Sequence, residues 1–133
     1  AFVPGEKADM TLARMVLSGG IVSGMRMGTG LTRRMMPVFQ PLQSDRKRNM
    51  LGRSYVYLLV LGVAPEHQGR GWGGKLLRAI IEYCGQRSRS LHLETETESN
   101  VRMYERFGFR TIRTITLPAL NVPMWEMVRE PGA

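Results

Sequence analysis

The stretch LGVAPEHQGRGWGGK, residues 61–75, decides the fold because it joins an apolar run to an amphipathic run through a glycine-rich loop. The apolar run, Tyr55 to Val63, is rich in β-branched and aromatic side chains, which predicts a strand buried on both faces. Behind the loop, apolar residues recur at helical spacing and predict a helix from Gly71 to Cys84, which Gly85 ends. The loop therefore stands where a strand passes into a helix.

The chain after this helix continues an α/β pattern. Ser90 to Thr95 predicts a second strand, and a strand–helix–strand crossover this short implies a parallel pair. Val101 to Phe107 predicts a short helix that Ser99 or Asn100 caps. The elements that remain are two strands with an antiparallel pairing, Phe109 to Leu117 and Met124 to Arg129.

Residues 1–53 predict a mostly helical segment. Ala1 to Pro4 is interpreted as the end of a strand, and residues 10–29 predict a helix that glycines weaken or break. A second helix is predicted to begin over residues 31–36. The polar and basic stretch from Gln43 to Met50 is interpreted as a connector.

Composition restricts the class of protein. Of 133 residues, 43% are hydrophobic and 23% are charged, which is typical of one soluble domain. A single cysteine and two histidines exclude a disulfide framework and a metal centre rich in these residues, so we expect a reduced, cytoplasmic protein without bound metal. The longest apolar run, Tyr55 to Ala64, is too short to span a bilayer, and we expect no membrane partner.

The net charge of +8 is concentrated in residues 1–53, which carry nine basic and three acidic side chains. A basic half is compatible with nucleic acid, but no zinc-finger, RNA-recognition or helix-turn-helix pattern surrounds it. A phosphorylated cofactor or an acidic substrate explains the same charge, and we favour that interpretation over nucleic acid.

Four glycines between Gly69 and Gly74 predict a phosphate-binding loop, because backbone N–H groups can converge on an anion at the positive end of a helix. The spacing Gly69-x-Gly71-x-x-Gly74 matches the dinucleotide-binding fingerprint, but a proline-containing segment separates it from the strand. The spacing Gly69-x-x-x-x-Gly74-Lys75 matches the nucleotide-triphosphate loop, except that Leu76 stands where a magnesium-binding hydroxyl belongs.

A third interpretation explains more of the chain. The segment Val63-x-Pro65-x-x-Gln68-Gly69-Arg70-Gly71-x-Gly73 resembles the acetyl-CoA loop of the GNAT family of N-acetyltransferases, whose signature is Gln/Arg-x-x-Gly-x-Gly/Ala. Downstream, the stretch from Asn100 through Tyr104 to Gly108-Phe109 is similar to the family's Asn…Tyr-x-x-x-Gly-Phe segment. The resemblance covers roughly residues 54–129. It implies an α/β fold with a GNAT-like mixed central sheet flanked by helices, in a single domain of residues 1–133.

The resemblance implies a site for acetyl-CoA as co-substrate within residues 54–133. The main-chain groups of Leu61 and Val63 would hold the pantetheine as a surrogate strand, and Asn100 is a further candidate contact. Cationic side chains beside the loop would neutralise phosphate. The pyrophosphate would lie on the loop residues Gln68, Gly69, Arg70, Gly71, Trp72 and Gly73.

The same resemblance implies a proton donor, and the amine also needs a base or a water relay because it loses a proton. Tyr104 corresponds to the family tyrosine that donates a proton to the departing thiolate, and its alternative role is packing. Glu94 is the candidate base for the amine, with Glu96, His92 or a water relay as alternatives. These three side chains share strand parity and are expected to face away from Leu91 and Leu93. The alternative for Glu94 is a solvated carboxylate at a strand end.

The N-terminal part departs from the family pattern. The family's first strands are not evident in residues 1–53, so we expect this part to be truncated or atypical and to lie on the acceptor side. The sheet edge beside Tyr55 to Val63 then needs a cover, either methionine-rich helices or a second copy of the chain. The predicted function is transfer of acetyl from acetyl-CoA to an amine of a small molecule or peptide. A non-catalytic CoA-binding or regulatory module and a nucleic-acid-binding domain are the alternatives.

Overall fold

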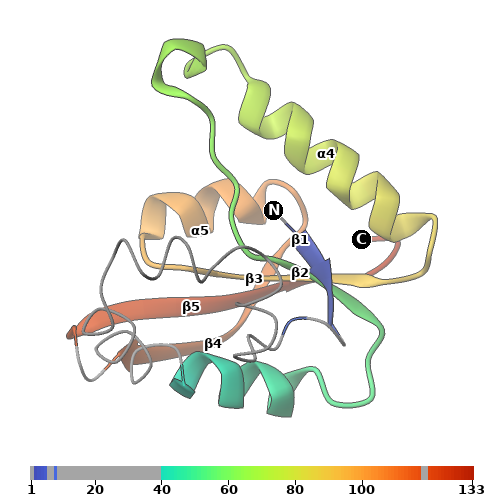
Figure 1. Ribbon diagram of the computed structural model, residues 1–133, viewed down its shortest axis with the longest axis vertical. Helices are drawn as coiled ribbons and strands as arrows, with labels where there is room; N and C mark the ends of the chain where they lie inside the picture. The colour runs from blue at the N-terminus through green and yellow to red at the C-terminus, as the bar shows by residue number, and fades with distance from the viewer. Residues whose placement is uncertain (1, 6–7, 9–39, 118–119) are drawn as a thin grey trace, which may run out of the picture.

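The computed structural model describes residues 2–5, 8, 40–117 and 120–133. Its strands are β1 (Phe2–Pro4), β2 (Tyr55–Leu58), β3 (Ser90–Thr95), β4 (Arg110–Leu117) and β5 (Val122–Arg129), and its labelled helices are α4 (Trp72–Gly85) and α5 (Glu98–Glu105). The strands form one sheet in the order β1-β2-β3-β5-β4 (Figure 1). Helices α4 and α5 cover one face, and a helix over residues 40–49 lies against the other. This arrangement confirms the predicted mixed sheet flanked by helices.

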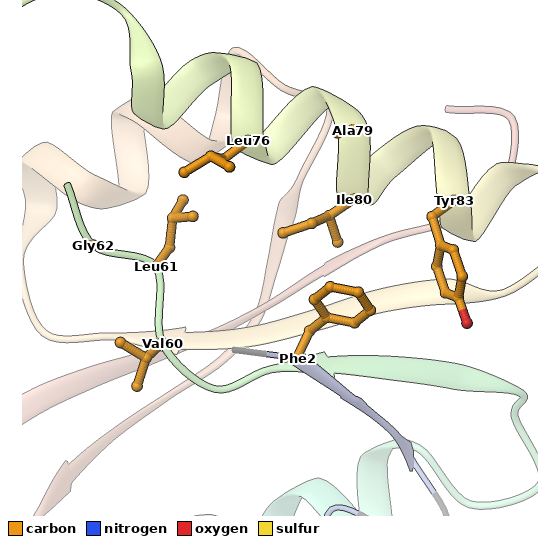
Figure 2. A pocket seen from close by; sticks show the side chains of 8 residues that line it. All are labelled: Phe2, Val60, Leu61, Gly62, Leu76, Ala79, Ile80 and Tyr83. Atoms are coloured by element: carbon orange, nitrogen blue, oxygen red, sulfur yellow. The ribbon is translucent and has the colours of Figure 1, made fainter.

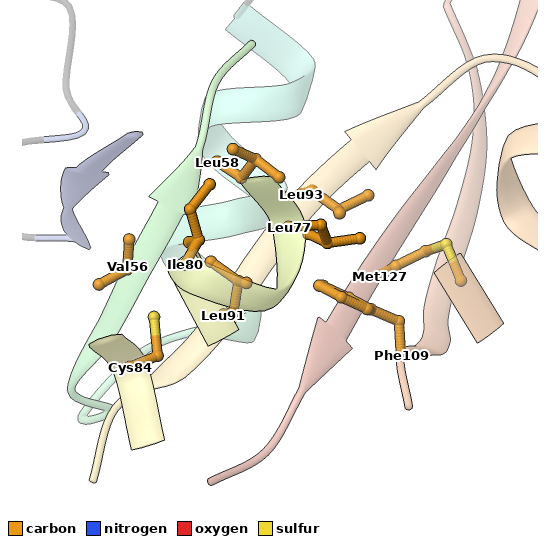
Figure 3. Packing of buried hydrophobic residues seen from close by; sticks show 9 residues of the cluster. All are labelled: Val56, Leu58, Leu77, Ile80, Cys84, Leu91, Leu93, Phe109 and Met127. Atoms are coloured by element: carbon orange, nitrogen blue, oxygen red, sulfur yellow. The ribbon is translucent and has the colours of Figure 1, made fainter. Parts of the chain in front are cut away.

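The apolar core lies between α4 and the sheet (Figure 3). The buried residues of α4 recur three or four positions apart, so they share the face that meets the sheet. Burying a side chain of this kind stabilises a fold by about 1.5–3 kcal/mol. The buried members of this core are Val56, Leu58, Leu77, Ile80, Cys84, Leu91, Leu93, Phe109 and Met127.

Several predicted elements are confirmed by the pairing of the strands. β2 and β3 are parallel, with Tyr57 opposite His92. β3 has the predicted bounds, and α4 begins and ends one residue after the predicted helix. β4 and β5 pair antiparallel as expected, and β5 also pairs antiparallel with β3.

The predicted strand from Tyr55 to Val63 is too long, because β2 ends at Leu58. Leu59 and Val60 are 43% and 59% exposed, so the chain leaves the sheet while β3 continues to Thr95. An apolar run predicts burial and does not indicate where the hydrogen bonds between two strands stop. The last pair of this ladder joins Tyr57 to His92, and the two strands separate beyond it.

Two further sequence predictions are wrong. The stretch from Gln43 to Met50 is not a connector, because residues 40–49 are helical and Leu42 and Arg46 are buried. The helix predicted from Val101 begins earlier, at Glu98, and its N-cap is Thr97 rather than Ser99 or Asn100. Serine and asparagine are preferred over threonine as N-caps, but a threonine hydroxyl can also accept from the first turn, and here Thr97 does so.

β1 confirms that the first residues form a strand. It pairs antiparallel with β2, from Phe2 opposite Leu58 to Pro4 opposite Val56. The prediction that methionine-rich helices or a second copy cover this edge is therefore wrong for β2 itself, since β1 covers it. The predicted helices over residues 10–29 and 31–36 lie outside the described residues. Within the described part of the chain, no helix is both long enough and apolar enough to cross a membrane.

Candidate active site

The glycine-rich loop leads from the chain after β2 into α4. Pro65–His67 forms one turn of 3-10 helix, after which Gly69 and Gly71 take left-handed backbone angles, with φ of 73° and 76°. Gly71 is the N-cap of α4, whose first-turn N–H groups have no partner inside the helix. A Cβ atom at Gly69 or Gly71 would meet nothing within 4 Å, so this side of the loop is open. Such a loop fits an anionic group.

Two contacts hold the loop against the extended chain after β2. Gln68 Nε2 donates a hydrogen bond of 3.0 Å to the carbonyl oxygen of Val63. A Cβ atom on Gly73 would lie 3.7 Å from a methyl group of Val63, so the first turn of α4 packs beside that residue. Gln68 and Gly73 therefore set how the loop lies relative to the main chain of residues 61–63.

Positive charge gathers on the first two turns of α4. Lys75 Nζ lies 4.6 Å from the centroid of the Trp72 ring, and Arg78 Cζ lies 5.4 Å from that of the Phe107 ring. Arg70 is exposed in the loop, and the first turn of α4 contains no acidic residue. These charges add to the positive end of the helix dipole, so the electrostatics favour a phosphate group here.

The start of α5 is tied to the end of β3. The Thr97 hydroxyl accepts a hydrogen bond of 3.3 Å from the backbone N–H of Asn100. The Asn100 side chain donates a hydrogen bond of 3.0 Å to the Thr95 hydroxyl. Asn100 thus fixes the helix to the strand in this structure, which is a role the sequence did not indicate.

Tyr104 lies on α5, and its half-buried ring packs against the edge of the core. Its ring centroid is 5.4 Å from that of Phe109, and it packs against the same apolar cluster as Leu61 and Phe107. Burial raises the pKa of the Tyr104 phenol, and the nearby Glu96 carboxylate raises it further. The phenol therefore stays protonated at neutral pH and can donate a proton.

Glu94 lies on the opposite face of the sheet from Tyr104. Its side chain is 5% exposed, and the Tyr57 hydroxyl donates a short hydrogen bond to Oε2. Arg46 lies 3.7 Å from Oε1, reaching it from the helix over residues 40–49. Burial is the largest cause that raises the pKa of Glu94, Glu126 raises it further, and His92, Tyr57 and Arg46 oppose this rise. Glu94 is therefore not a solvated carboxylate.

The expected strand parity is confirmed for His92 and Glu94. His92 is fully buried, and its ring nitrogens lie 3.9 Å from a Glu94 oxygen and 3.8 Å from a Glu126 oxygen. The face opposite Leu91 and Leu93 thus carries a buried polar cluster, whereas Glu96 is exposed.

Four members of this cluster were missed by the sequence analysis. Glu126 interrupts an otherwise apolar strand, and a charge in such a strand is the signal that could have found it. Arg46 and Asn49 are three residues apart and share a helix face, but the stretch was interpreted as a connector. Tyr57 and Tyr55 are two residues apart in β2, so their side chains lie on the same face of the sheet. Among the described residues, no group of three or more ligand-type side chains could hold a metal ion.

A pocket of about 620 Å³ opens under α4 on the side of β1 (Figure 2). Ile80, Leu76 and Leu61 extend into the same space as the ring of Phe2. Among the described residues that line it, Tyr83 alone carries a titratable group, so this part of the lining holds no acid–base pair. The described lining residues are Phe2, Val60, Leu61, Gly62, Leu76, Ala79, Ile80 and Tyr83.

Comparison with protein families matches residues 28–109 to the family described as Acetyltransferase (GNAT) family. An uncharacterized N-acetyltransferase of Schizosaccharomyces pombe is 35% identical to the chain over 99 residues, which are 70% of this chain and 40% of the relative. The chain thus spans less than half the length of this curated relative.

Solved structures share the fold. A NatC complex bound to Gag peptide and CoA contains a chain with a TM-score of 0.54 and 23% identity, over 60% of this chain and 53% of that one. The ribosomal-protein-S18-alanine N-acetyltransferase of Escherichia coli has a TM-score of 0.52 and 21% identity, over 59% and 56%. An Arabidopsis thaliana protein in complex with the bisubstrate analogue CoA-Ac-MVNAL has a TM-score of 0.52 and 25% identity, over 59% and 56%.

Proposed function

Because the chain belongs to the acetyltransferase (GNAT) family, we propose that it transfers the acetyl group of acetyl-CoA to an amine. The observation that carries this proposal is the position of the glycine loop. The loop and the first turn of α4 contact Val63, in the chain that follows β2 after β2 and β3 separate, and the family match includes β2, β3 and α4. Tyr104, a half-buried phenol, packs against the apolar core under α4.

The loop is proposed to bind the pyrophosphate through its backbone N–H groups. Gly69 and Gly71 leave the loop surface open because they lack side chains at left-handed positions. Arg70 and the aromatic face of Trp72 border the same surface. The six residues in this proposed contact are Gln68, Gly69, Arg70, Gly71, Trp72 and Gly73.

The pantetheine is proposed to lie along the main chain of Leu61 and Val63. These residues follow β2 where it has left β3, so β3 does not pair with their backbone groups, and we propose that an extended ligand does so instead. The Val63 carbonyl already accepts from Gln68, and a carbonyl oxygen has a second lone pair. Asn100 lies where β3 passes into α5 and is proposed as a further contact.

The reaction is proposed to be direct attack of the amine on the thioester. The amine nitrogen forms a bond to the acetyl carbon, and the bond from that carbon to sulfur breaks with its electron pair leaving on sulfur. Tyr104 donates its proton to the sulfur. Glu94 accepts the proton that the amine loses, directly or through water. The acid and the base thus act from the two faces of the sheet.

The acceptor is proposed to be a small-molecule or peptide amine, with a peptide favoured. The Arabidopsis thaliana relative, at 25% identity, was solved with an analogue that joins CoA to a peptide sequence, which supports a peptide. Residues 1–53 are proposed to lie on the acceptor side, and residues 54–133 to form the acetyl-CoA-binding core of one cytoplasmic domain. In this structure the helix over residues 40–49 already lies against the face that carries Glu94.

The first experiment is calorimetric titration with acetyl-CoA, with NAD and ATP as controls, followed by acetylation of a panel of peptide and small-molecule amines. Binding of acetyl-CoA alone, followed by acetylation of at least one amine, supports the proposal. Binding without turnover of any amine would favour a non-catalytic CoA-binding module instead. Salt-dependent binding of nucleic acid that acetyl-CoA does not affect would favour a nucleic-acid-binding domain.

A further inference from the structure

We propose that His92 and Glu126 form a proton relay behind Glu94. The relay stores the proton that the amine loses. This inference rests on the proposed function, because it assigns Glu94 as the base. His92 and Glu126 act through Glu94 and are positioning residues.

The first observation is the pairing of two buried carboxylates. Glu94 and Glu126 are direct partners across the antiparallel β3–β5 ladder, so their side chains lie on the same face. Glu126 is fully buried, and the Glu94 side chain is 5% exposed. Like charges directly opposite one another destabilise a sheet, and burial increases this cost. The two carboxylates are therefore more stable when a neighbouring group shares a proton with them.

The second observation is the position of His92 between these carboxylates. Nδ1 faces Glu94 Oε1 at 3.9 Å, and Nε2 faces Glu126 Oε2 at 3.8 Å. Within the described part of the chain, neither ring nitrogen has a hydrogen-bond partner, and neither do Glu94 Oε1 and Glu126 Oε1. Each gap exceeds a hydrogen bond by roughly 1 Å, which a small rotation of the side chains closes.

The surrounding groups determine which oxygen of each carboxylate is left toward the His92 ring. Asn49 Nδ2 donates a hydrogen bond of 2.7 Å to Glu126 Oε2, which keeps that carboxylate in place as an acceptor. Tyr57 donates to Glu94 Oε2 and leaves Oε1 toward His92. Arg46 lies 4.2 Å above the Tyr57 ring and 3.7 Å from Glu94 Oε1. Arg113 is the partner of Glu126 across the β4–β5 ladder, and its Nε lies 3.1 Å from an Asp45 oxygen. The Tyr55 ring meets the His92 ring edge-on, and its hydroxyl donates to Gly5 outside the cluster.

The relay consists of two proton transfers. In the resting state His92 carries its proton on Nε2, toward Glu126, and offers the lone pair of Nδ1 to Glu94. When the amine attacks, its N–H bond breaks and an O–H bond forms on Glu94. That O–H bond then breaks as an N–H bond forms on Nδ1, which leaves an imidazolium between two carboxylates. After the product leaves, the proton returns through Glu94 to water, and no electron is gained or lost.

The test is nitrogen-15 NMR of the imidazole rings, because the chain has only two histidines and the exposed His67 is an internal reference. We expect His92 in the Nε2–H tautomer. We also expect its ring signals to titrate at lower pH in the isosteric variants Glu126→Gln and Glu94→Gln, because each removes a negative charge beside the ring. His67 is expected to titrate unchanged. A His92 ring whose tautomer is Nδ1–H, or whose titration ignores both substitutions, would overturn the proposal.

Kinetics with an amine from the acceptor panel supply the second readout. We expect His92→Asn to lower kcat/KM for the amine about tenfold or more and to leave the KM for acetyl-CoA unchanged. We expect Glu126→Gln to move the acidic limb of the pH profile to lower pH, whereas a merely structural residue would lower the rate at every pH. Tyr55→Phe is the matched control, since it keeps the ring beside His92 and removes a hydroxyl outside the cluster.

The two readouts separate this proposal from the proposed function. A chain that acetylates no amine in the panel contradicts the proposed function, yet its NMR titrations still decide whether His92 is coupled to both carboxylates. A chain that acetylates an amine but whose pH profile is the same in Glu126→Gln and in the parent contradicts the relay alone.

Discussion

Burial acts on Tyr104 and on Glu94 in the same direction, since it disfavours the charged form of both side chains. The raised pKa of Tyr104 keeps the phenol protonated over the whole neutral range, as a proton donor requires. The raised pKa of Glu94 makes its carboxylate a stronger base once it is ionised, and it also delays ionisation to higher pH. Burial thus suits both side chains to the roles proposed for them.

The first residue-scale prediction concerns Tyr104→Phe. The variant keeps the ring that packs on Phe109 and loses only the hydroxyl, so the fold and the affinity for acetyl-CoA are expected to stay unchanged. We expect kcat to fall roughly a hundredfold, because the thiolate then leaves without a proton donor. Steady-state kinetics and calorimetry measure the two quantities separately. A kcat equal to that of the parent would exclude Tyr104 from the reaction.

The second residue-scale prediction concerns Glu94→Gln. Because the pKa of Glu94 is raised in the folded chain, the parent rate is expected to fall as the pH decreases through that raised pKa. The variant is expected to lose most of its activity together with this acidic limb. The free energy of unfolding changes in the opposite sense. The raised pKa of Glu94 stabilises the folded parent at low pH, and this stabilisation is lost as the pH rises through that pKa. Urea unfolding should therefore show a gain in stability for Glu94→Gln at neutral pH and little change in acid.

Gly71 is the N-cap of α4, so a substitution there affects both the loop and the start of the helix. Gly71→Ala places a Cβ on a left-handed backbone, which costs about 1–2 kcal/mol, and it puts a methyl group into the proposed anion site. We expect weaker acetyl-CoA binding in calorimetry and a lower midpoint of thermal unfolding. Gly85→Ala, at the other end of α4, is the control, because Gly85 has no left-handed φ and nothing lies within 4 Å of an added Cβ. Unchanged acetyl-CoA affinity in Gly71→Ala would contradict the loop assignment.

The sequence predicted elements with a strong local signal and erred where tertiary contacts decide. α4 and β3 were predicted to within one residue, because helical spacing and a bounded apolar run are local patterns. The end of β2 at Leu58 could not be predicted, since Leu59 and Val60 continue the apolar run although they lie outside the sheet. The helix over residues 40–49 was missed because the polar side chains that it buries look like solvent-exposed ones in a sequence.

The candidate site likewise has a part that local sequence patterns indicated and a part that they did not. The sequence indicated the glycine loop and Tyr104 as candidates because each belongs to a motif with short spacings along the chain. The buried cluster around Glu94 joins residues from one helix and three strands, and Asn49 and Glu126 are 77 positions apart. Parity predicted that His92 and Glu94 share a face, but no local pattern indicates that Tyr57 and Arg46 cover them.

The whole-molecule prediction concerns the open edge of β1. Among the described strands, β1 ends the sheet, and Phe2 beside the apolar pocket is 41% exposed. A second copy of the chain is expected to cover this edge, because exposed strand edges and apolar patches favour association. Sedimentation velocity should show a dimer that Phe2→Glu dissociates, whereas Leu120→Glu, at a distant exposed leucine, should not dissociate it. A parent chain that sediments as a monomer at every concentration would contradict this prediction.

Cys84 has a practical consequence for experiments on this chain. Its side chain is 2% exposed in the core, and burial raises the pKa of its thiol, so we expect the native protein to react slowly with thiol reagents. It is also the only cysteine. Rapid colour in a thiol assay therefore reports released coenzyme A without background from the protein. Slow labelling of Cys84 reports instead how often α4 lifts from the sheet, so one reagent separates turnover from the opening of the core by timescale alone.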